Sequence, residues 1–440
     1  MDWYDLTIRF FSLADANVRY VLAGAILLGG AAGGLGTFAF LQRRSLIGDA
    51  LAHAALPGIG LAFLLAGRKD YLLLLLGAAT TGWIGAIAVN LITRFSRLKQ
   101  DAALGIVLTS FFGFGIVLLT RIQKVGAGTQ AGLDKFLFGQ ASAMGAADVQ
   151  TLAIVALILL GTVILWFARF KLISFDPAFA RSIGLPVGLI QFVLTTLIVL
   201  AVTIGLQAVG VVLMAAMLIT PAAAARQWTD RLGLMIVVAS IFGILSGIVG
   251  AYVSFLAPRL PTGPWMVVAV SGIFLVSLLF SPGRGLVPRM IGHLQRRRRM
   301  AREHLLKAWF KAGQDSRNWN VLYPINQIRQ FWSYDSKTTR RLVRSLVRRG
   351  MLAREGDMYR LTDRGAAEGA RITRLHRLWE VYLSRYLDLP EDHVHRDAEE
   401  IEHVITPEIE QRLTELLDRP EHDPHQQKIP YGVKEGLDES

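Results

Sequence analysis

Hydrophobic residues form long uninterrupted runs over the first two thirds of the chain, each long enough to cross a bilayer as a helix. These runs cover residues 18–40, 46–66, 71–93, 102–120, 148–168, 186–204, 205–225, 232–255 and 264–281. The sixth and seventh runs are nearly continuous, so the pattern allows eight or nine spans. Gly-rich stretches such as LLGGAAGGLGTF favour close contact between helices in lipid. We therefore expect an all-α polytopic membrane domain with about nine transmembrane helices.

The polar pattern changes near residue 283. Residues 1–282 contain 18 Lys and Arg, 10 Asp, no Glu and a single histidine, His53. The remainder contains 29 Lys and Arg, 24 Asp and Glu and the other eight histidines. The formal net charge of +13 therefore divides into +8 and +5. The second part has the charge density of a water-soluble domain.

Composition narrows the class of protein and of site. A chain of 440 residues that is 52% hydrophobic is typical of an integral membrane protein. No basic stretch or small-residue cleavage site marks the first run as a removable signal, so we expect it to remain as a span. With no cysteine, any metal must be held by His, Asp or Glu.

Basic residues predict the orientation. The stretch GRGLVPRMIGHLQRRRRMAREH follows the last span, and the positive-inside rule places it in the cytoplasm. We expect a multi-pass protein of the plasma (inner) membrane with a cytoplasmic C-terminal part. With nine spans, the N-terminus lies outside.

Asp49 and His53 lie four residues apart inside the second hydrophobic run. An ionisable residue within a span is costly and is by default a candidate functional residue. Positions i and i+4 share one helix face, so the two side chains could offer oxygen and nitrogen to one divalent cation. The alternative is structural, with Asp49 capping the helix and His53 bonding a neighbouring helix.

Two stretches of the hydrophobic part resemble a known family. SLIGDALAHAALPGIGLAFLL and QAVGVVLMAAMLITPAAAAR are similar to signatures of the ATP-binding-cassette permeases that import manganese, zinc or iron. The resemblance covers about residues 15–282. It implies that Asp49 and His53 line the translocation path, and that an extracytoplasmic metal-binding protein and a second permease copy or sister permease complete the importer.

The same family resemblance extends to SFDPAFARSIGLP at residues 174–186. In the family this element docks in a groove of the ATPase, which implies coupling roles for Phe175, Asp176, Pro177, Arg181 and Gly184. Family members often have an acidic residue where this chain has Ala178. The alternative is an amphipathic helix at the membrane interface.

The chain contains no GxxxxGK[ST] phosphate-binding motif. It is therefore expected to be a permease subunit and not an enzyme, with ATP hydrolysed by a separate cytoplasmic ATPase. An ion-coupled secondary metal transporter remains the alternative, since Gly- and Pro-containing spans suit both.

A basic module follows the membrane part. Residues 323–350 have the pattern helix, turn, helix, and MLAREGDMYRLTDRG predicts a short hairpin wing, which together indicate a winged helix-turn-helix. The second helix would bury an apolar face and expose a basic stripe suited to phosphates of nucleic acid or to anionic lipid. We do not expect sequence-specific DNA binding, and a solvated basic face is the remaining alternative. The stripe consists of Lys337, Arg340, Arg344 and Arg348.

The last module contains histidines and acids at helical spacings, which suit two divalent sites with mixed oxygen and nitrogen ligands. Charge-rich helices produce such spacings by chance, so salt-bridged solvated faces are the alternative. The spaced residues are His376, Glu380, His395, Glu399, Glu402 and His403.

Residues 300–430 resemble the diphtheria-toxin-repressor family of metal-dependent regulators, through LHRLWE, VHRDAEEIEHV and RPEHDPHQQKIP. The resemblance implies one ion bound by His376, Glu380 and His395. It implies a second ion bound by Glu399, Glu402 and His403, and Glu399 resembles the manganese-responsive branch. His304 stands where the family has Met or Asp and is a further candidate ligand, whereas Lys307 stands where the manganese branch has an acid.

The sequence thus predicts the permease subunit of an ATP-driven importer of Mn²⁺, or of Zn²⁺ or Fe²⁺, fused to a cytoplasmic metal-sensing part. A membrane-anchored metal-dependent DNA-binding regulator is the alternative. The expected order is a transmembrane permease domain (1–282), a basic juxtamembrane linker (283–299), a winged helix-turn-helix (300–367), a helical metal-binding and dimerisation domain (368–430) and a flexible tail (431–440).

Overall fold

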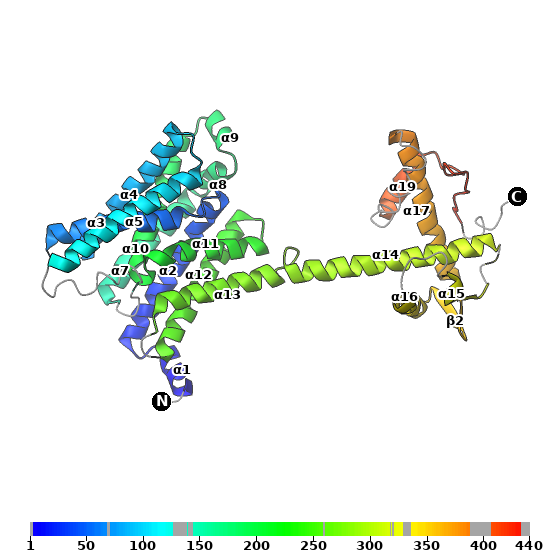
Figure 1. Ribbon diagram of the computed structural model, residues 1–440, viewed down its shortest axis with the longest axis horizontal. Helices are drawn as coiled ribbons and strands as arrows, with labels where there is room; N and C mark the ends of the chain where they lie inside the picture. The colour runs from blue at the N-terminus through cyan, green and yellow to red at the C-terminus, as the bar shows by residue number, and fades with distance from the viewer. Residues whose placement is uncertain are drawn as a thin grey trace. The chain divides into compact units, whose positions relative to one another are not determined.

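The computed structural model of the chain describes residues 3–67, 71–125, 139, 144–257, 260–316, 318, 321–328, 336–387 and 406–432. It divides into two compact units, residues 1–289 and 290–440, and its helices and strand β2 are labelled in Figure 1.

The first unit is entirely helical in its described part. Its helices are α1 (Trp3–Phe11), α2 (Ala16–Leu41), α3 (Ile47–Ala66), α4 (Tyr71–Phe95), α5 (Gln100–Val125), α7 (Ala146–Leu165), α8 (Phe167–Phe175), α9 (Pro177–Ser182), α10 (Val187–Val209), α11 (Val211–Trp228), α12 (Leu232–Leu256) and α13 (Thr262–Phe280). Nine of these described helices are long and apolar enough to cross a membrane, all except α1, α8 and α9. The prediction of an all-α polytopic protein with about nine spans is confirmed.

Helices α10 and α11 are separated by one residue, Gly210. Its φ of 92° and ψ of 163° lie in a region that glycine adopts without steric cost. The amide of Gly210 still donates to the Leu206 carbonyl at 2.9 Å, and its own carbonyl accepts from Met214 at 3.1 Å. The sixth and seventh spans are therefore two helices, and the break falls at Gly210 instead of between residues 204 and 205.

Helix α2 is the central helix of the first unit and packs against α12, α11, α7 and α10. Its contact with α12 brings two glycines face to face. A Cβ added to Gly29 would overlap the Gly243 carbonyl, and a Cβ added to Gly243 would overlap that of Gly29. The Gly-rich stretch predicted to favour close contact does so here, because backbones approach this closely in lipid only where side chains are absent.

Helix α3, which carries Asp49 and His53, contains Pro57. Proline has no amide hydrogen and disturbs the hydrogen bonding of the helix around it. Thr81 of α4 lies at this point and its Oγ1 accepts from the Gly58 amide at 3.1 Å. A neighbouring Thr thus satisfies the backbone at a proline within the membrane, and it fixes α3 against α4.

The second unit contains a winged helix fold. Its elements are the end of α14 (Leu286–Asp315), β1 (Tyr323–Pro324), α15 (Ile325–Ile328), α16 (Ser336–Arg348), β2 (Leu352–Glu355) and β3 (Met358–Leu361). The strands form an antiparallel sheet in the order β1-β3-β2, and the β2–β3 hairpin is the predicted wing. Trp309 and Phe310 of α14 and Val343 and Leu346 of α16 are buried in its core.

Helices α17 (Asp363–Leu387) and α19 (Pro407–Leu416) build the last module. Leu378 and Val381 of α17 pack against Leu413, Leu417 and Ile429. Residues 286–299 of the predicted linker belong to α14. The predicted first helix of the helix-turn-helix, residues 323–332, instead begins as strand β1 and continues as the short α15. Residues 329–335, which include its end and most of the turn, lie outside the described residues, as do residues 433–440 of the predicted tail.

Candidate metal sites

Asp49 and His53 form a pair on one face of α3. His53 Nε2 lies 3.2 Å from Asp49 Oδ1, and the side chains are 12% and 31% exposed, respectively. The second ring nitrogen, His53 Nδ1, is buried without a hydrogen-bond partner among the described residues. His53 lies six residues after the start of α3, about 9 Å along the helix axis. A carboxylate and an imidazole therefore meet in a mostly apolar setting, with ligand atoms suited to a divalent transition metal.

The structure does not place Asp49 at the helix cap. The N-cap residue of α3 is Leu46, and no side chain caps this end. His53 meets the neighbouring α5 through its ring, which stands edge-on to Phe112 with centroids 4.7 Å apart. The capping role considered as an alternative is thus not observed.

The two signature stretches of the permease resemblance lie together. Gly48, directly before Asp49, faces α11, where a Cβ on it would lie 3.2 Å from Ala215 Cα and 3.1 Å from Leu218 Cδ2. Helix α11 therefore packs against α3 at the residue directly before Asp49.

Residues 174–186 form a compact element between α7 and α10. Asp176 caps α9, with its Oδ1 accepting from the Phe179 amide at 2.8 Å, and Pro177 takes the first helical position, where its missing amide hydrogen costs nothing. Gly184 ends the element with a φ of 82°. Three of the predicted coupling residues thus shape the element, and Arg181, in the last turn of α9, is exposed.

The same element exposes an apolar face. Phe175, Phe179 and Ile183, spaced four residues apart, are 59%, 53% and 53% exposed. Helices α8 and α9 lie on the side of the first unit opposite α1 (Figure 1). An exposed apolar patch on a rigid element is typical of a docking surface, and an interfacial helix would present the same face to lipid.

The basic stripe on α16 is formed as predicted. Lys337, Arg340, Arg344 and Arg348 are all exposed, while Leu342, Val343 and Leu346 on the other face are buried. The stripe can contact phosphate groups, whether of nucleic acid or of lipid.

His376 and Glu380 form a buried pair on α17. His376 Nε2 lies 3.1 Å from Glu380 Oε1, with side chains only 4% and 3% exposed. Both line a cavity of about 310 Å³ together with Lys307, Lys311, Gln314, Thr373, Arg377, Asp423, His425 and Gln427. The pair predicted from i, i+4 spacing is thus formed.

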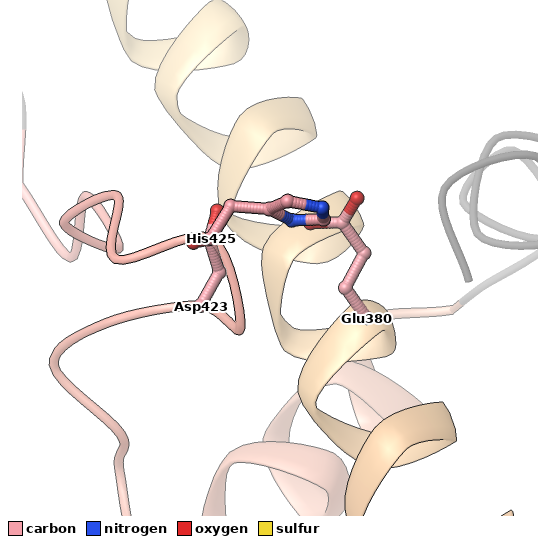
Figure 2. Close-up of side chains that lie close together, drawn as sticks. All are labelled: Glu380, Asp423 and His425. Atoms are coloured by element: carbon pink, nitrogen blue, oxygen red, sulfur yellow. The ribbon is translucent and has the colours of Figure 1, made fainter. Parts of the chain in front are cut away.

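Two residues that the sequence did not single out lie close to Glu380 of this pair. A carboxylate oxygen of Glu380, one of Asp423 and a ring nitrogen of His425 all lie within 4.8 Å of one another. Figure 2 shows Glu380 reaching from α17 toward the His425 ring, with Asp423 on the same loop as His425. The sequence HDPHQQ places an Asp and a His two residues apart, which could have marked them as candidate metal ligands. Because they lie far along the chain from Glu380, the sequence did not indicate that the three side chains meet.

Arginines hold this loop on α17. Arg377 Nε lies 3.5 Å from Asp423 Oδ2, and its Nη2 donates to Gln427 Oε1 at 2.8 Å. Arg374 donates to the Pro430 carbonyl at 3.1 Å and pairs with Glu410 of α19. These bonds place Asp423 and His425 beside Glu380.

The structure places His304 on another helix and does not describe the other predicted ligands. His395, Glu399, Glu402 and His403 lie outside the described residues, as part of 388–405. His304 is half-buried on α14, and Lys307, one turn later, lines the cavity.

Comparisons with known proteins agree with both parts of the chain. The ABC 3 transport family matches residues 14–281, and the iron dependent repressor, metal binding and dimerisation domain matches residues 362–431. The chain is 41% identical to the manganese transport system membrane protein MntC of Bacillus subtilis over 97% of its own length and 98% of that protein. It is 44% identical to the zinc transport system membrane protein TroC of Treponema pallidum over 67% of its own length and 96% of that protein.

A solved structure shares the membrane fold. PsaBC from Streptococcus pneumoniae, in complex with Fab, is 31% identical, with a TM-score of 0.57 over 66% of this chain and 99% of that one. All three of these proteins match the first unit, and the match to MntC of Bacillus subtilis extends over nearly the whole chain. The repressor-like match covers most of the last module.

Proposed function

Because this chain belongs to the ABC 3 transport family, we propose that it is the permease subunit of an importer of divalent transition metal, with Mn²⁺ as the physiological ion. The observations that carry the proposal are the pairing of Asp49 with His53 on α3 and the packing of α3 against α11, the other signature helix. The MntC relative, matched over nearly its whole length, is named for manganese and TroC for zinc. A carboxylate and an imidazole accept either ion, as well as Fe²⁺, so geometry and availability decide between them.

Transport requires partners that this chain does not supply. A separate cytoplasmic ATPase would bind the exposed face of Phe175, Phe179 and Ile183 and transmit closure to α10 through residues 174–186. An extracytoplasmic metal-binding protein would deliver the ion. Two copies of this chain would complete the pore, an arrangement supported by the match to a dimerisation domain.

The second unit would be the metal-sensing part, on the cytoplasmic side where the basic run 296–299 places it. The buried His376–Glu380 pair supports metal binding there. A DNA-binding regulator is the second candidate function, favoured by the exposed stripe and the wing beside it. Family membership weighs against the ion-coupled transporter considered from the sequence.

Reconstitution tests the transport function. The chain would be placed in proteoliposomes with its ATPase and binding protein, and Mn²⁺ uptake would be measured with ATP on the ATPase side. We expect uptake that requires ATP, that stops when the phosphate-binding Lys of the ATPase is replaced, and that ionophores leave unchanged. Uptake that proceeds without ATP and collapses with an ionophore would identify a secondary transporter instead.

A further inference from the structure

The first half of α14, residues 286–299, carries an apolar stripe and a run of arginines, both of them exposed. We propose that this segment lies along the cytoplasmic surface of the bilayer, with the apolar stripe in the headgroup boundary and the arginines on the phosphates of anionic phospholipids. This goes beyond transport and metal sensing, and it gives the predicted basic linker a binding surface of its own.

The apolar stripe follows the helical repeat. Leu286, Met290 and Leu294 are spaced four residues apart and therefore lie on one face of α14. They are 45%, 64% and 52% exposed, and Ile291, which follows Met290, is 49% exposed. A helix surrounded by water turns such a stripe toward a core. An apolar surface outside the described chain is therefore needed to cover it.

The second half of the same helix shows the contrast. Leu305, Leu306 and Trp309 are at most 1% exposed, because they pack in the core of the winged helix. None of residues 286–294 belongs to a hydrophobic core of the described chain. The uncovered stripe is thus confined to the part of α14 that directly follows the membrane domain.

Three arginines follow the stripe without a protein partner. Arg296, Arg297 and Arg298 are exposed, and their side chains have no hydrogen bond or ion pair among the described residues. The next residue, Arg299, is instead paired with Glu303 at 2.7 Å. Clusters of basic residues beside a span are attracted to the anionic lipids of the cytoplasmic leaflet. Long arginine side chains can also reach the phosphates while the helix itself lies deeper.

The residues before α14 fix its start at the cytoplasmic end of the spans. Arg284 donates from Nη1 to the Arg226 carbonyl at 2.8 Å and forms an ion pair with Asp230. Arg226 lies in the last turn of α11, the seventh span, and Asp230 lies in the loop that follows it. Leu286, two residues after Arg284, is therefore at the level of the bilayer surface.

A turn also separates α14 from the last span. Helix α13 ends at Phe280, and Gly283 has a φ of 78°, a conformation that glycine adopts without steric cost. A break of this kind permits the next helix to leave the direction of the span. An amphipathic helix that follows such a break can lie in the plane of the interface.

Charge favours a bilayer over a second copy of this chain as the cover of the stripe. Two copies packed through this face would bring their arginine runs together, and like charges placed together disfavour association. An anionic bilayer provides apolar and negatively charged surface side by side, which is what this face of α14 requires.

Nitroxide labelling tests the inference cleanly, because the chain has no cysteine. The intact chain with Leu294→Cys would be labelled and reconstituted in bilayers of phosphatidylglycerol with phosphatidylcholine. Electron paramagnetic resonance then measures the accessibility of the label to oxygen, which concentrates in lipid, and to a water-soluble nickel chelate. We expect high oxygen and low nickel accessibility, and the same result for Met290→Cys one turn earlier. Gln295→Cys, about 100° around the helix from residue 294, should be accessible to nickel.

The role of charge is tested by removing three arginines. Each arginine near an anionic surface contributes about fivefold to binding. The triple variant Arg296→Gln, Arg297→Gln and Arg298→Gln should therefore lower the ratio of inserted to water-exposed label at residue 294 about a hundredfold. Bilayers of phosphatidylcholine alone should release the label in the same way.

The matched control removes the same charge from another exposed surface. Arg340→Gln, Arg344→Gln and Arg348→Gln on α16 should leave the label at residue 294 inserted.

Three results would overturn the inference. Nickel accessibility at residue 294 in both kinds of bilayer would place the stripe in water. Low accessibility to both reagents would show that protein covers the stripe. Insertion unchanged by the α14 triple variant would remove the role of anionic lipid. Since no transport is measured, each result leaves the importer proposal to its own test.

Discussion

Asp49 and His53 are two ionisable residues that pair with each other within the second span, where ionisable residues are costly. His53 is the only histidine in residues 1–282, and its Nδ1 is buried without a hydrogen-bond partner in the part of the chain that the structure describes. A buried nitrogen without a hydrogen bond costs about 1–3 kcal/mol of folding free energy. A purely structural role for the pair would leave this cost uncompensated. A cation path gives the pair a function that accounts for this cost.

We predict that Asp49→Asn and His53→Ala each lower Mn²⁺ uptake by more than about tenfold, since the loss of about 1.4 kcal/mol in cation binding is already a tenfold change. Radioactive Mn²⁺ uptake by proteoliposomes gives the measurement. Asp101→Asn, which changes an exposed carboxylate in the first turn of α5, is the matched control. Normal expression and ATPase association are expected throughout, and near-normal uptake by both path variants would reduce the pair to a structural role.

Sequence spacing could reveal residue pairs on one helix but not groups from different segments. The contacts of Asp49 with His53 and of His376 with Glu380 follow from i, i+4 geometry. Asp423 and His425 approach Glu380 only because α19 and the arginines of α17 position their loop. No local pattern encodes that approach, so the sequence did not single out Asp423 or His425 as candidate ligands.

Helix α16 is the element on which the regulator hypothesis depends. Its exposed arginines can bind phosphates without reading a sequence, and contacts to phosphate carry no base information. We predict weak binding of the intact chain to duplex DNA that falls steeply with salt. Each neutralised phosphate contributes about 0.9 to the slope of log K against log salt concentration, so Arg344→Ala should lower the slope by about 0.9.

Fluorescence anisotropy over a series of salt concentrations makes this measurement. Arg412→Ala, an exposed arginine of α19, should leave the slope unchanged. Nanomolar binding to one particular duplex near physiological salt would contradict the prediction and favour the membrane-anchored regulator.

Hydropathy predicted the spanning elements well because a bilayer imposes length and apolarity on any helix that crosses it. It could not position the break at Gly210, since residues 186–225 are apolar almost throughout and the break depends on one backbone conformation. The short α8 and α9 likewise depend on Asp176 as a cap and Gly184 as a terminator. Short elements such as α8 and α9 depend on single residues at their ends. A hydropathy profile averages over many residues and therefore does not reveal these positions.

The whole chain combines a permease unit with a second unit that is not common to all of its relatives. TroC is matched over 96% of its length by 67% of this chain, so a permease of this family functions with little or nothing equivalent to the second unit. We propose that the added unit has a role beyond the pore itself. Dimerisation and feedback from cytoplasmic metal are the two roles that its ligands and its family match support.

Feedback requires that metal in the second unit favour one state of the transporter. A ligand shifts a conformational equilibrium only through its differential affinity for the two states, and such couplings are typically about 5–150-fold. We predict that Mn²⁺ on the cytoplasmic side inhibits uptake by the intact chain within that range. We expect inhibition and not activation, because stopping import when cytoplasmic metal is plentiful protects a cell from excess metal.

Three chains separate the two roles when uptake is measured against internal Mn²⁺ concentration. They are the intact chain, the double variant Glu402→Gln with His403→Ala, and a chain that ends after Arg289, where the first unit ends. The variants remove candidate ligands or the whole second unit. If internal Mn²⁺ inhibits uptake only in the intact chain, the second unit mediates feedback inhibition. The same dependence of uptake on internal Mn²⁺ in all three chains would exclude feedback inhibition and leave dimerisation as the role of the second unit. In that case the shortened chain should lose self-association in detergent, whereas the double variant should keep it.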